Sequence, residues 1–483
     1  MSHKENVCKS NMSFEECELT ILRSAVDKAQ KKIGKRVVSS PEVHDMIDIV
    51  ENFIRKRQLI CYGGTAINNI LPVHDQFYDR EAELPDYDFY SPDSLQDAKD
   101  LADAFFLKGY NEVEAKSGVH HGTYKVFCNG IALADITYLP NELFRVIFKD
   151  AIKVKGILYC PPNFLRMSMY LELSRPAGDV SRWEKIAKRL ALLNKHYPVK
   201  TTKCDSVQFQ RELSDEVISE IPGDKRNLSH SVYSIVKDGI ISAGGVFFGG
   251  YAIAMYSKYM PRKEREFIRQ VPDFDALVHD PEKVSNDIKH RLSDKGIKYA
   301  RVYKRQAIGE VIPEQYEIRV GQDTVAVLYK PIACHSFNKI LIHDKEVRIA
   351  TIDTMLSFYL AFLYANKPYY DTNRILCMTM FLFDVQQKNR LEQKGLLRRF
   401  TVTCFGKQES VEDIRSKKIQ KYNEFRRHPN KKEYEAWFLN YRPAYMQLKL
   451  KNRDVTNRKI TIRKRAKESH RKTQRFFSNI YKR

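Results

Sequence analysis

The sequence predicts an α+β protein with two tandem domains, each a mixed sheet with flanking helices, the second a degenerate copy of the first. A block of short motifs recurs after roughly 190 residues, which is typical of a duplicated domain. Helical and strand-like periodicities alternate within each block. The 483 residues suffice for two or three domains, and we place them at 1–200, 201–400 and 401–483, the last being a helical and basic C-terminal region.

The composition indicates a folded protein with a polyanionic partner. Hydrophobic residues make up 43% and charged residues 29% of the chain. No apolar run reaches the ~20 residues that span a bilayer, and the N-terminus lacks the apolar core of a signal peptide. The formal charge of +22 favours nucleic acid, without distinguishing RNA from DNA, and leaves an anionic membrane surface open.

The positive charge is concentrated at the C-terminus. Residues 451–483 contain 13 Lys or Arg and 2 acidic residues. Their net charge of +11 is half of the +22 of the whole chain. We expect this tail to bind RNA, although a solubilising role would produce the same composition.

The nine cysteines are scattered and include no C-x-x-C pair. The spacing therefore suggests neither a zinc site nor a disulfide framework, and we expect reduced thiols.

Two helices precede the first motif. Residues 13–35 have amphipathic spacing, with Ser13 and Glu16 placed as a capping box. A second helix begins at the Ser40-Pro41 cap. Its predicted core face comprises Val43, Met46, Ile47, Val50 and Ile54.

The first motif is a glycine turn at the end of a short apolar run. Gly63 and Gly64 precede a helix that starts near Thr65. Glycines allow backbone N–H groups to approach a phosphate, and a helix N-terminus adds a favourable dipole. A Gly-Gly pair alone also suits an ordinary strand-to-helix turn.

The second motif is a set of three carboxylates. Asp86 and Asp88 lie two apart in a β-favouring run, so their side chains project from one face of a strand. Adjacent anions are unfavourable without a cation, and hard divalent ions prefer oxygen ligands. Asp135 lies in a further β-rich run that would complete a two-metal site. Asp-x-Asp alone also suits a solvated edge strand, but the ordered set favours a metal site.

The remainder of the first domain alternates helices and strands. We expect helices at 94–109, in the middle of 158–176 and at 182–195. Strands at 123–129 and 131–139 should form a tight hairpin around Gly130. The basic residues Arg166, Arg175, Lys153 and Lys155 are candidates for triphosphate contacts, although each also suits a surface charge.

The motifs then recur in a decayed form. Gly249-Gly250 and Asp273-x-Asp275 repeat the first copy, but aligned Tyr-x-Pro segments place Ala326 at the position of Asp135. Tyr251 replaces Thr65. We therefore expect the second copy to be catalytically inactive and to serve a structural or RNA-guiding role. Residues 405–450 look helical, with Trp437 and Tyr441 as packing anchors.

Gly-Gly-Thr, Asp-x-Asp and a third Asp on a neighbouring strand resemble the signature of the polymerase β-like nucleotidyltransferase superfamily. The tandem active and decayed copies, with the ELSRP and RWEK segments, are similar to the poly(A) polymerase catalytic subunit of poxviruses and giant DNA viruses. The resemblance covers roughly residues 40–400. It implies two nucleotidyltransferase-like domains and template-independent transfer of AMP from ATP to mRNA 3′ ends.

The resemblance also implies roles for individual residues. Asp86 and Asp88 would bind two Mg²⁺ or Mn²⁺ ions, and Asp135 would hold the catalytic one. The residues expected to bind the nucleotide are Gly63, Gly64, Thr65 and Asn68. Location in the virion and host cytoplasm, and either a homodimer or a separate processivity partner, are further expectations.

Two other functions fit parts of the pattern. A CCA- or uridylyl-adding enzyme would use the same motifs with another nucleotide. A non-catalytic RNA-binding scaffold would need both copies to have decayed, and the three carboxylates of the first copy argue against it.

Overall fold

The computed structural model describes residues 8, 11–38, 40–79, 83–201, 204, 207, 209, 211–220, 225–265, 268, 274–389, 392–428 and 431–443. The basic tail at 451–483 and Asp273 lie outside these residues. The chain forms two compact units. The first unit comprises Met1–Arg57, Asp79–Tyr138 and Gln420–Arg483, and the second comprises Gln58–Tyr78 and Leu139–Ile419.

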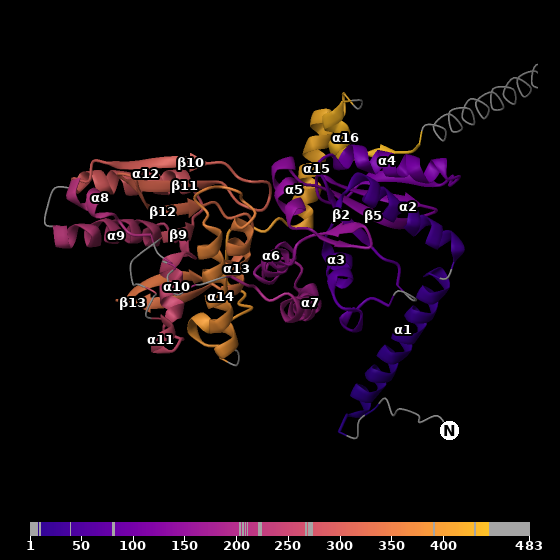
Figure 1. The fold of residues 1–483 in the computed structure, drawn as a ribbon, viewed down its shortest axis with the longest axis horizontal. Coiled ribbons are helices and arrows are strands. Elements are labelled where there is room, and N and C mark those ends of the chain that lie inside the picture. Colours follow the sequence, from indigo (N-terminus) through magenta and orange to yellow (C-terminus); the bar gives the residue numbers. More distant parts are fainter. Residues whose placement is uncertain are drawn as a thin grey trace, which may run out of the picture. The chain divides into compact units, whose positions relative to one another are not determined.

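Four helices belong to the described part of the first unit: α1 (Phe14–Val38), α2 (Pro41–Arg57), α4 (Ser94–Leu107) and α16 (Lys432–Phe438). The predicted capping box is confirmed, because the Glu16 N–H donates to Ser13 Oγ and the Ser13 N–H donates to Glu16 Oε2. Helix α2 buries four of the five predicted core residues, Val43, Met46, Val50 and Ile54. Helices α2 and α4 pack against strands of the same unit (Figure 1).

The strands of the first unit run in the order β16-β3-β4-β5-β2. Their bounds are β2 (Tyr87–Ser91), β3 (Val113–Ser117), β4 (Thr123–Cys128), β5 (Ile131–Tyr138) and β16 (Asn440–Tyr441). The predicted hairpin is confirmed: β4 and β5 are antiparallel, and Asn129 and Gly130 both adopt positive φ at the turn. Strand β5 then pairs in parallel with β2.

The C-terminal end of the described chain packs onto this unit. Trp437 stacks on His121 with ring centroids 4.1 Å apart. The Tyr441 hydroxyl donates to Asp103, and β16 extends the edge of β3. Both aromatic residues are therefore packing anchors, as predicted.

The second unit contains the glycine turn and the chain that follows β5 up to Ile419. Its first elements are β1 (Ile60–Cys61), α3 (Gly63–Ile70), η1 (Val73–Asp75), α5 (Asn141–Lys149), β6 (Ile152–Val154), β7 (Ile157–Tyr159), α6 (Pro162–Leu173), η2 (Val180–Arg182) and α7 (Trp183–His196). Strand β7 pairs in parallel with β1 and antiparallel with β6. Helices α3, α6 and α7 form a layer in which α6 contacts both of the others.

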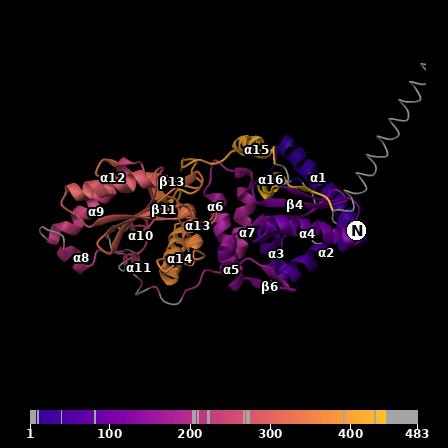
Figure 2. The same cartoon turned by 90° about the horizontal axis from the view of Figure 1, so that it is seen from above.

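The rest of the second unit is built on an eight-stranded mixed sheet in the order β10-β11-β12-β9-β8-β14-β13-β15. The strands are β8 (Val246–Phe247), β9 (Phe274–Leu277), β10 (Ala300–Arg305), β11 (Gln315–Val320), β12 (Asp323–Tyr329), β13 (His335–Ile342), β14 (Lys345–Ala350) and β15 (Cys404–Phe405). The helices are α8 (Asp215–Glu220), α9 (Lys225–Ser242), α10 (Gly250–Ser257), α11 (Arg262–Arg265), α12 (Pro281–Asp294), α13 (Ile352–Phe362), α14 (Thr372–Lys388), η3 (Gly395–Leu397) and α15 (Val411–Phe425), which extends past the unit boundary. Helices α9 and α12 lie side by side against this sheet (Figure 2).

The strand pairing of the first motif block recurs in the second. Strands β3, β4 and β5 are joined by antiparallel pairs and β5 pairs in parallel with β2. Strands β10, β11, β12 and β9 repeat this order and these directions. The pairing β1-β7-β6 is likewise repeated by β8-β14-β13. The fold thus supports a duplication of the whole domain.

The expectation of reduced thiols is wrong for six cysteines. The disulfides join Cys8 to Cys17, Cys204 to Cys377, and Cys334 to Cys404. The partners lie 9, 173 and 70 residues apart, and the two longer bonds join segments that only the fold brings together. Sequence spacing alone therefore contained no signal for them.

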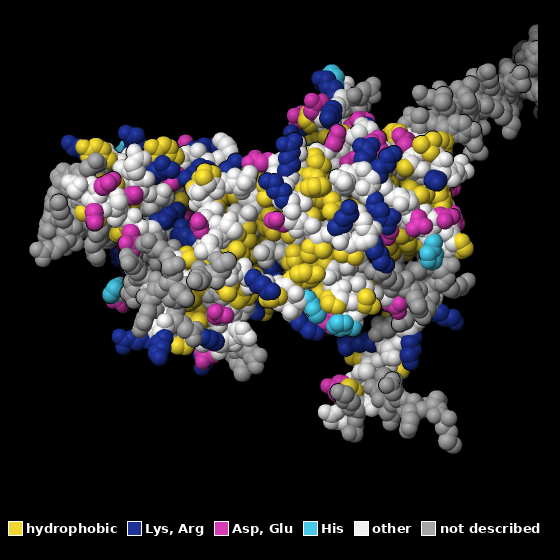
Figure 3. Space-filling view, in the orientation of Figure 1, with side chains coloured by type: hydrophobic (Ala, Val, Ile, Leu, Met, Phe, Trp, Pro, Cys, Tyr) yellow, Lys and Arg dark blue, Asp and Glu magenta, His cyan; other side chains and the backbone are white. Residues whose placement is uncertain are grey.

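Lys and Arg side chains are dispersed over the face of the molecule in Figure 3, interleaved with acidic and apolar side chains. The described surface in this view therefore does not single out one basic patch as a nucleic-acid interface. Within the part of the chain that the structure describes, no helix combines the length and apolarity needed to cross a membrane.

Candidate active site

The three predicted carboxylates all lie in the first unit: Asp86 just before β2, Asp88 on β2 and Asp135 on β5. Asp88 and Asp135 are paired residues of these parallel strands, so their side chains leave the same face of the sheet. Asp86 precedes β2 by one residue and lies two positions before Asp88. Asp86 is exposed, and the other two are partly buried. The fold therefore brings together the carboxylates that the sequence separates by nearly fifty residues.

The neighbouring strand places a cation beside Asp135. Lys125 on β4 is the antiparallel partner of Asp135 in the strand register. Its Nζ lies 2.5 Å from Asp135 Oδ2. The flanking residues Ala134 and Ile136 face the core and are buried. Asp135 is consequently fixed in position by the pleat, and its charge is partly balanced from one side.

The glycine turn lies in the second unit and begins α3. Gly63 has a φ of 73°, a backbone conformation that residues with a Cβ rarely adopt. A Cβ on Gly64 would lie 2.3 Å from the Tyr78 hydroxyl and 2.9 Å from an Arg189 guanidinium nitrogen. The backbone conformation therefore favours glycine at position 63, and a side chain at position 64 would displace the ends of Tyr78 and Arg189.

Arg189 is a functional candidate that the sequence did not reveal. Its guanidinium donates to the Tyr78 hydroxyl at 2.7 Å and lies over the Phe77 ring at 4.8 Å. This contact holds a cation beside Gly64, at the start of α3. In the sequence Arg189 is one of several basic residues on a predicted helix, and nothing in the spacing distinguishes it from the others.

Thr65 and Asn68 are buried in α3. Asn68 Oδ1 accepts hydrogen bonds from the backbone N–H groups of Phe77 and Tyr78. The Asn68 side chain therefore fixes the segment that carries Tyr78. Its predicted contact with a nucleotide stays a prediction.

Arg166 does not fit the triphosphate role considered for it. The side chain is fully buried, and its guanidinium donates to Asn163, Asn194 and the Tyr197 carbonyl. Burial lowers the pKa of Arg166 to about 10. This arginine therefore joins α6 to the end of α7 within the core, whereas Lys153 and Lys155 are exposed.

The second copy has a different set of charges at the corresponding strand pair. Asp275 on β9 pairs with Val327 on β12, as Asp88 pairs with Asp135. The register thus corrects the sequence alignment: Val327, not Ala326, occupies the third carboxylate position. Both residues are apolar, so the predicted loss of that carboxylate stands. Arg211 donates to Asp275 Oδ2 at 3.0 Å.

Tyr251 is the bulky residue at the second glycine turn. It is largely buried, and its ring packs against Phe247 and Phe274. A Cβ on Gly249 would lie 2.3 Å from Asp275 Oδ2. Aromatic packing and a close carboxylate thus fill the start of α10.

Comparison with known proteins finds a family that matches the part of the chain with these features. Residues 48–179 match the family described as poly(A) polymerase catalytic subunit. This range contains the glycine turn, all three carboxylates and Lys125.

Two viral relatives match similar lengths of this chain. A protein of Acanthamoeba polyphaga mimivirus, named as a poly(A) polymerase catalytic subunit, is 35% identical over 185 residues, which cover 37% of this chain and 30% of the relative. A protein of African swine fever virus with the same name is 30% identical over 195 residues, covering 39% and 41%. The chain thus matches less than half the length of either relative.

One solved structure matches most of the chain. The crystal structure of the Megavirus polyadenylate synthase covers 92% of this chain and 88% of its own, with a TM-score of 0.72 and 20% sequence identity. This likeness establishes the fold and agrees with an α+β chain of two tandem nucleotidyltransferase-like domains. The resemblance to the viral poly(A) polymerase catalytic subunit is therefore confirmed, in sequence over residues 48–179 and in fold over most of the chain.

Proposed function

We propose that this chain is a template-independent poly(A) polymerase that transfers AMP from ATP to the 3′ end of mRNA and releases pyrophosphate. The observation that carries this proposal is the parallel pairing of Asp88 with Asp135, with Asp86 two residues before Asp88. These residues lie within the segment that matches the family. The relatives named above bear the same activity in their names.

The three carboxylates suit a hard divalent cation such as Mg²⁺ or Mn²⁺. They supply only oxygen donors, and Lys125 balances one of the three charges. Asp86 and Asp88 would hold two ions, and Asp135 would hold the one nearer the RNA 3′-hydroxyl. Ions bound there would supply Lewis-acid stabilisation of the attacking and leaving oxygens. Lys125 would orient the Asp135 carboxylate.

The start of α3 suits the phosphates of ATP. Backbone N–H groups at Gly63, Gly64 and Thr65 are the first of the helix and can donate to an anion. The guanidinium of Arg189 adds a positive charge beside Gly64. Arginine recognises phosphate through paired N–H donors. Arg189, rather than Arg166, is thus our candidate for a triphosphate contact.

RNA would be the second substrate, bound in part through electrostatic attraction to this strongly basic chain. A partner subunit fits the description of the matched family as a catalytic subunit. A homodimer or a separate processivity factor are the two forms of that proposal. The second copy, without the third carboxylate, would act as a structural or RNA-guiding domain. The virion and the host cytoplasm are the proposed locations.

The double variant Asp86→Ala/Asp88→Ala tests the proposal. Purified protein is incubated with labelled RNA and ATP, and extension should fall by at least about 100-fold, because several kcal/mol of charge stabilisation are lost. Wild-type extension with each single nucleoside triphosphate separates a poly(A) polymerase from a CCA- or uridylyl-adding enzyme. Unchanged extension by the double variant would show that the site is wrong, and no extension by the wild type would favour a scaffold.

A further inference from the structure

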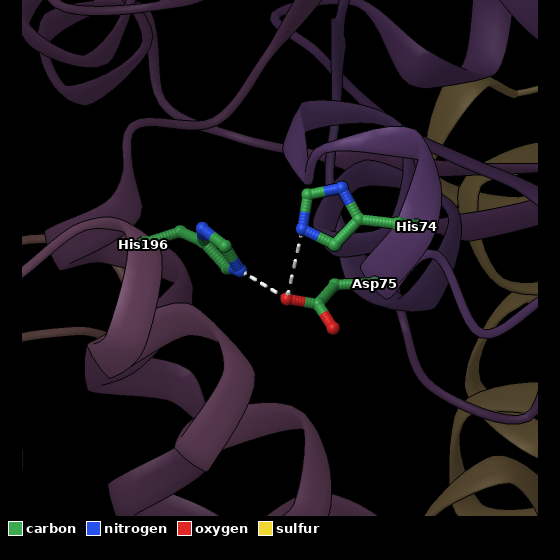
Figure 4. A group of neighbouring side chains, drawn as sticks. All are labelled: His74, Asp75 and His196. Carbon is green, nitrogen blue, oxygen red and sulfur yellow. Dashed lines mark hydrogen bonds and ion pairs between the residues drawn. The ribbon is translucent and has the colours of Figure 1, made fainter.

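Two histidines and an aspartate of the second unit converge at its surface. His74 and Asp75 lie in η1, and His196 is the last residue of α7. Figure 4 shows both imidazoles directed toward the Asp75 carboxylate. His196 Nε2 lies 2.5 Å and His74 Nε2 lies 3.7 Å from Asp75 Oδ2.

The spacing of these atoms suits one metal ion. One donor atom from each residue lies within 4.8 Å of the others. Ligand atoms of tetrahedral zinc are roughly 3.3 Å apart, since Zn–N and Zn–O bonds are about 2.0–2.2 Å long. Two imidazole nitrogens and one carboxylate oxygen are a donor set that prefers zinc-class ions to Mg²⁺ or Ca²⁺. Water would complete the coordination on the exposed side of His74.

The surroundings attract a cation to this point. His196 ends α7, and the C-terminus of a helix carries partial negative charge. Lys195 Nζ lies 2.7 Å from the same Asp75 oxygen. Lys195 and His196 both form hydrogen bonds to this carboxylate oxygen. The Lys195 side chain is 61% exposed and can turn into solvent when a metal ion takes its place.

We propose that His74, Asp75 and His196 form a binding site for one zinc-class divalent ion, which fastens the segment after α3 to the end of α7. The segment from η1 continues into Phe77 and Tyr78, which contact Arg189. Arg189 lies seven residues before His196 on α7, two helical turns away on the same side.

The position of the site gives it a structural consequence. An ion there would join the two segments that hold Tyr78 and Arg189 beside Gly64. The ion would restrain these two segments through η1 and the end of α7. The hydrogen bonds from Phe77 and Tyr78 to Asn68 would stay unchanged. The site is therefore a positioning device for the start of α3, and its existence does not depend on the reaction that the chain performs.

Metal titration of the full chain tests the site. EDTA-treated protein in excess Mg²⁺, which saturates oxygen-only sites, is titrated with Co²⁺ while the visible absorption is recorded, and Zn²⁺ is then added as a competitor. We expect one Co²⁺ per chain with nitrogen-containing coordination, displaced by Zn²⁺. His74→Ala and His196→Ala should each weaken binding by at least about 100-fold, because a direct ligand matters more than the outer-shell partners whose loss costs 10–100-fold.

Two variants serve as controls. Lys195→Met should bind the ion as tightly as the wild type or more tightly, because it removes a competing cation and no ligand. His290→Ala removes an exposed histidine of α12 and should change nothing. Thermal unfolding supplies a second readout: Zn²⁺ should raise the Tm of the wild type and of both controls, but not that of His74→Ala.

Two outcomes would overturn the proposal. If the wild type takes up no Co²⁺ or Zn²⁺ at micromolar concentration, the cluster is only an ion pair of Asp75 with Lys195 and His196. If His74→Ala binds as tightly as the wild type, the ion lies elsewhere. Circular dichroism of each variant excludes misfolding as the cause, and His74 is sufficiently exposed for its truncation to leave the core intact.

Discussion

The strand pairs β2–β5 and β9–β12 have the same parallel pairing but carry different charged residues. In the first pair Asp88 stands beside Asp135, which forms an ion pair with Lys125. In the second pair Asp275 stands beside Val327 and is bonded to Arg211. The same backbone therefore carries two neighbouring carboxylates in the first copy and one carboxylate paired with an arginine in the second.

The strand next to each pair continues this contrast. Lys125 of β4 faces Asp135, whereas Glu317 of β11 is the register partner of Val327. Arg305 and Arg319 form ion pairs with Glu317. Burial alone would raise the pKa of Glu317, but hydrogen bonds from Arg319 and Thr324 and the charge of Arg305 lower it. In the second copy, arginines thus form ion pairs with Asp275 and Glu317. A retained Asp therefore does not by itself indicate a metal site.

Alanine substitutions in the two glycine turns should differ most in their effect on RNA extension. Gly64→Ala places a methyl group against Tyr78 and Arg189, and we expect about a 100-fold loss of RNA extension, with about 1–3 kcal/mol of destabilisation from overpacking. Gly249→Ala creates an equally close contact with Asp275 and should lower stability alone. Extension assays and urea unfolding of both variants measure the contrast. Equal activity of Gly64→Ala and the wild type would remove the glycine turn from the site.

A restored third carboxylate should not restore a second active site. Val327→Asp buries a charge beside Asp275 and Glu317, and an uncompensated buried charge costs roughly 3 kcal/mol or more. We expect a lower free energy of unfolding and no added extension activity. Ala326→Asp is the matched variant one residue away, on the other face of β12. If activity rises in Val327→Asp, the neutralising arginines are less important than we infer.

Arg211 should stabilise the second copy because its positive charge pairs with Asp275. Arg211→Met leaves Asp275 without its arginine partner and should cost about 1–2 kcal/mol of stability in EDTA. Addition of Mn²⁺ should recover part of this loss in the variant and have no such effect on Arg211→Lys, which keeps the charge. Chemical denaturation with and without Mn²⁺ tests the effect. An unchanged free energy of unfolding would mean that the ion pair is incidental.

Substitution of Lys125 should have the smallest effect of these variants. We expect it to change the affinity for the metal ion. The lysine competes with a divalent ion for Asp135 Oδ2, so Lys125→Met should lower the Mg²⁺ concentration for half-maximal extension by a few fold. Lys125→Arg keeps the charge and is the control. A higher Mg²⁺ requirement in Lys125→Met would show that the lysine orients Asp135 more than it competes.

Local patterns predicted the elements whose causes are local. The capping box of Ser13 and Glu16 and the hairpin at Asn129-Gly130 follow from adjacent residues, and both are present. These features could be read from the sequence because a few neighbouring residues determine them.

Long-range contacts could not be predicted in this way. The alignment of Tyr-x-Pro segments missed Val327 by one residue, because Pro140 lies five residues after Asp135 whereas Pro331 lies four residues after Val327. Arg211 reaches Asp275 across 64 residues, and Arg189 reaches Tyr78 across 111. Such contacts depend on how helices and loops pack, which residue spacing along the chain does not record.

Replacing Asp135 tests most directly whether the first strand pair alone is catalytic. Asp135→Asn keeps the shape of the side chain and removes the charge, and Asp275→Asn makes the same change in the second copy. RNA extension with ATP and Mg²⁺ should fall by at least about 100-fold in the first variant and stay within a few fold of the wild type in the second. Normal extension by Asp135→Asn, or an equal loss in both variants, would contradict the account.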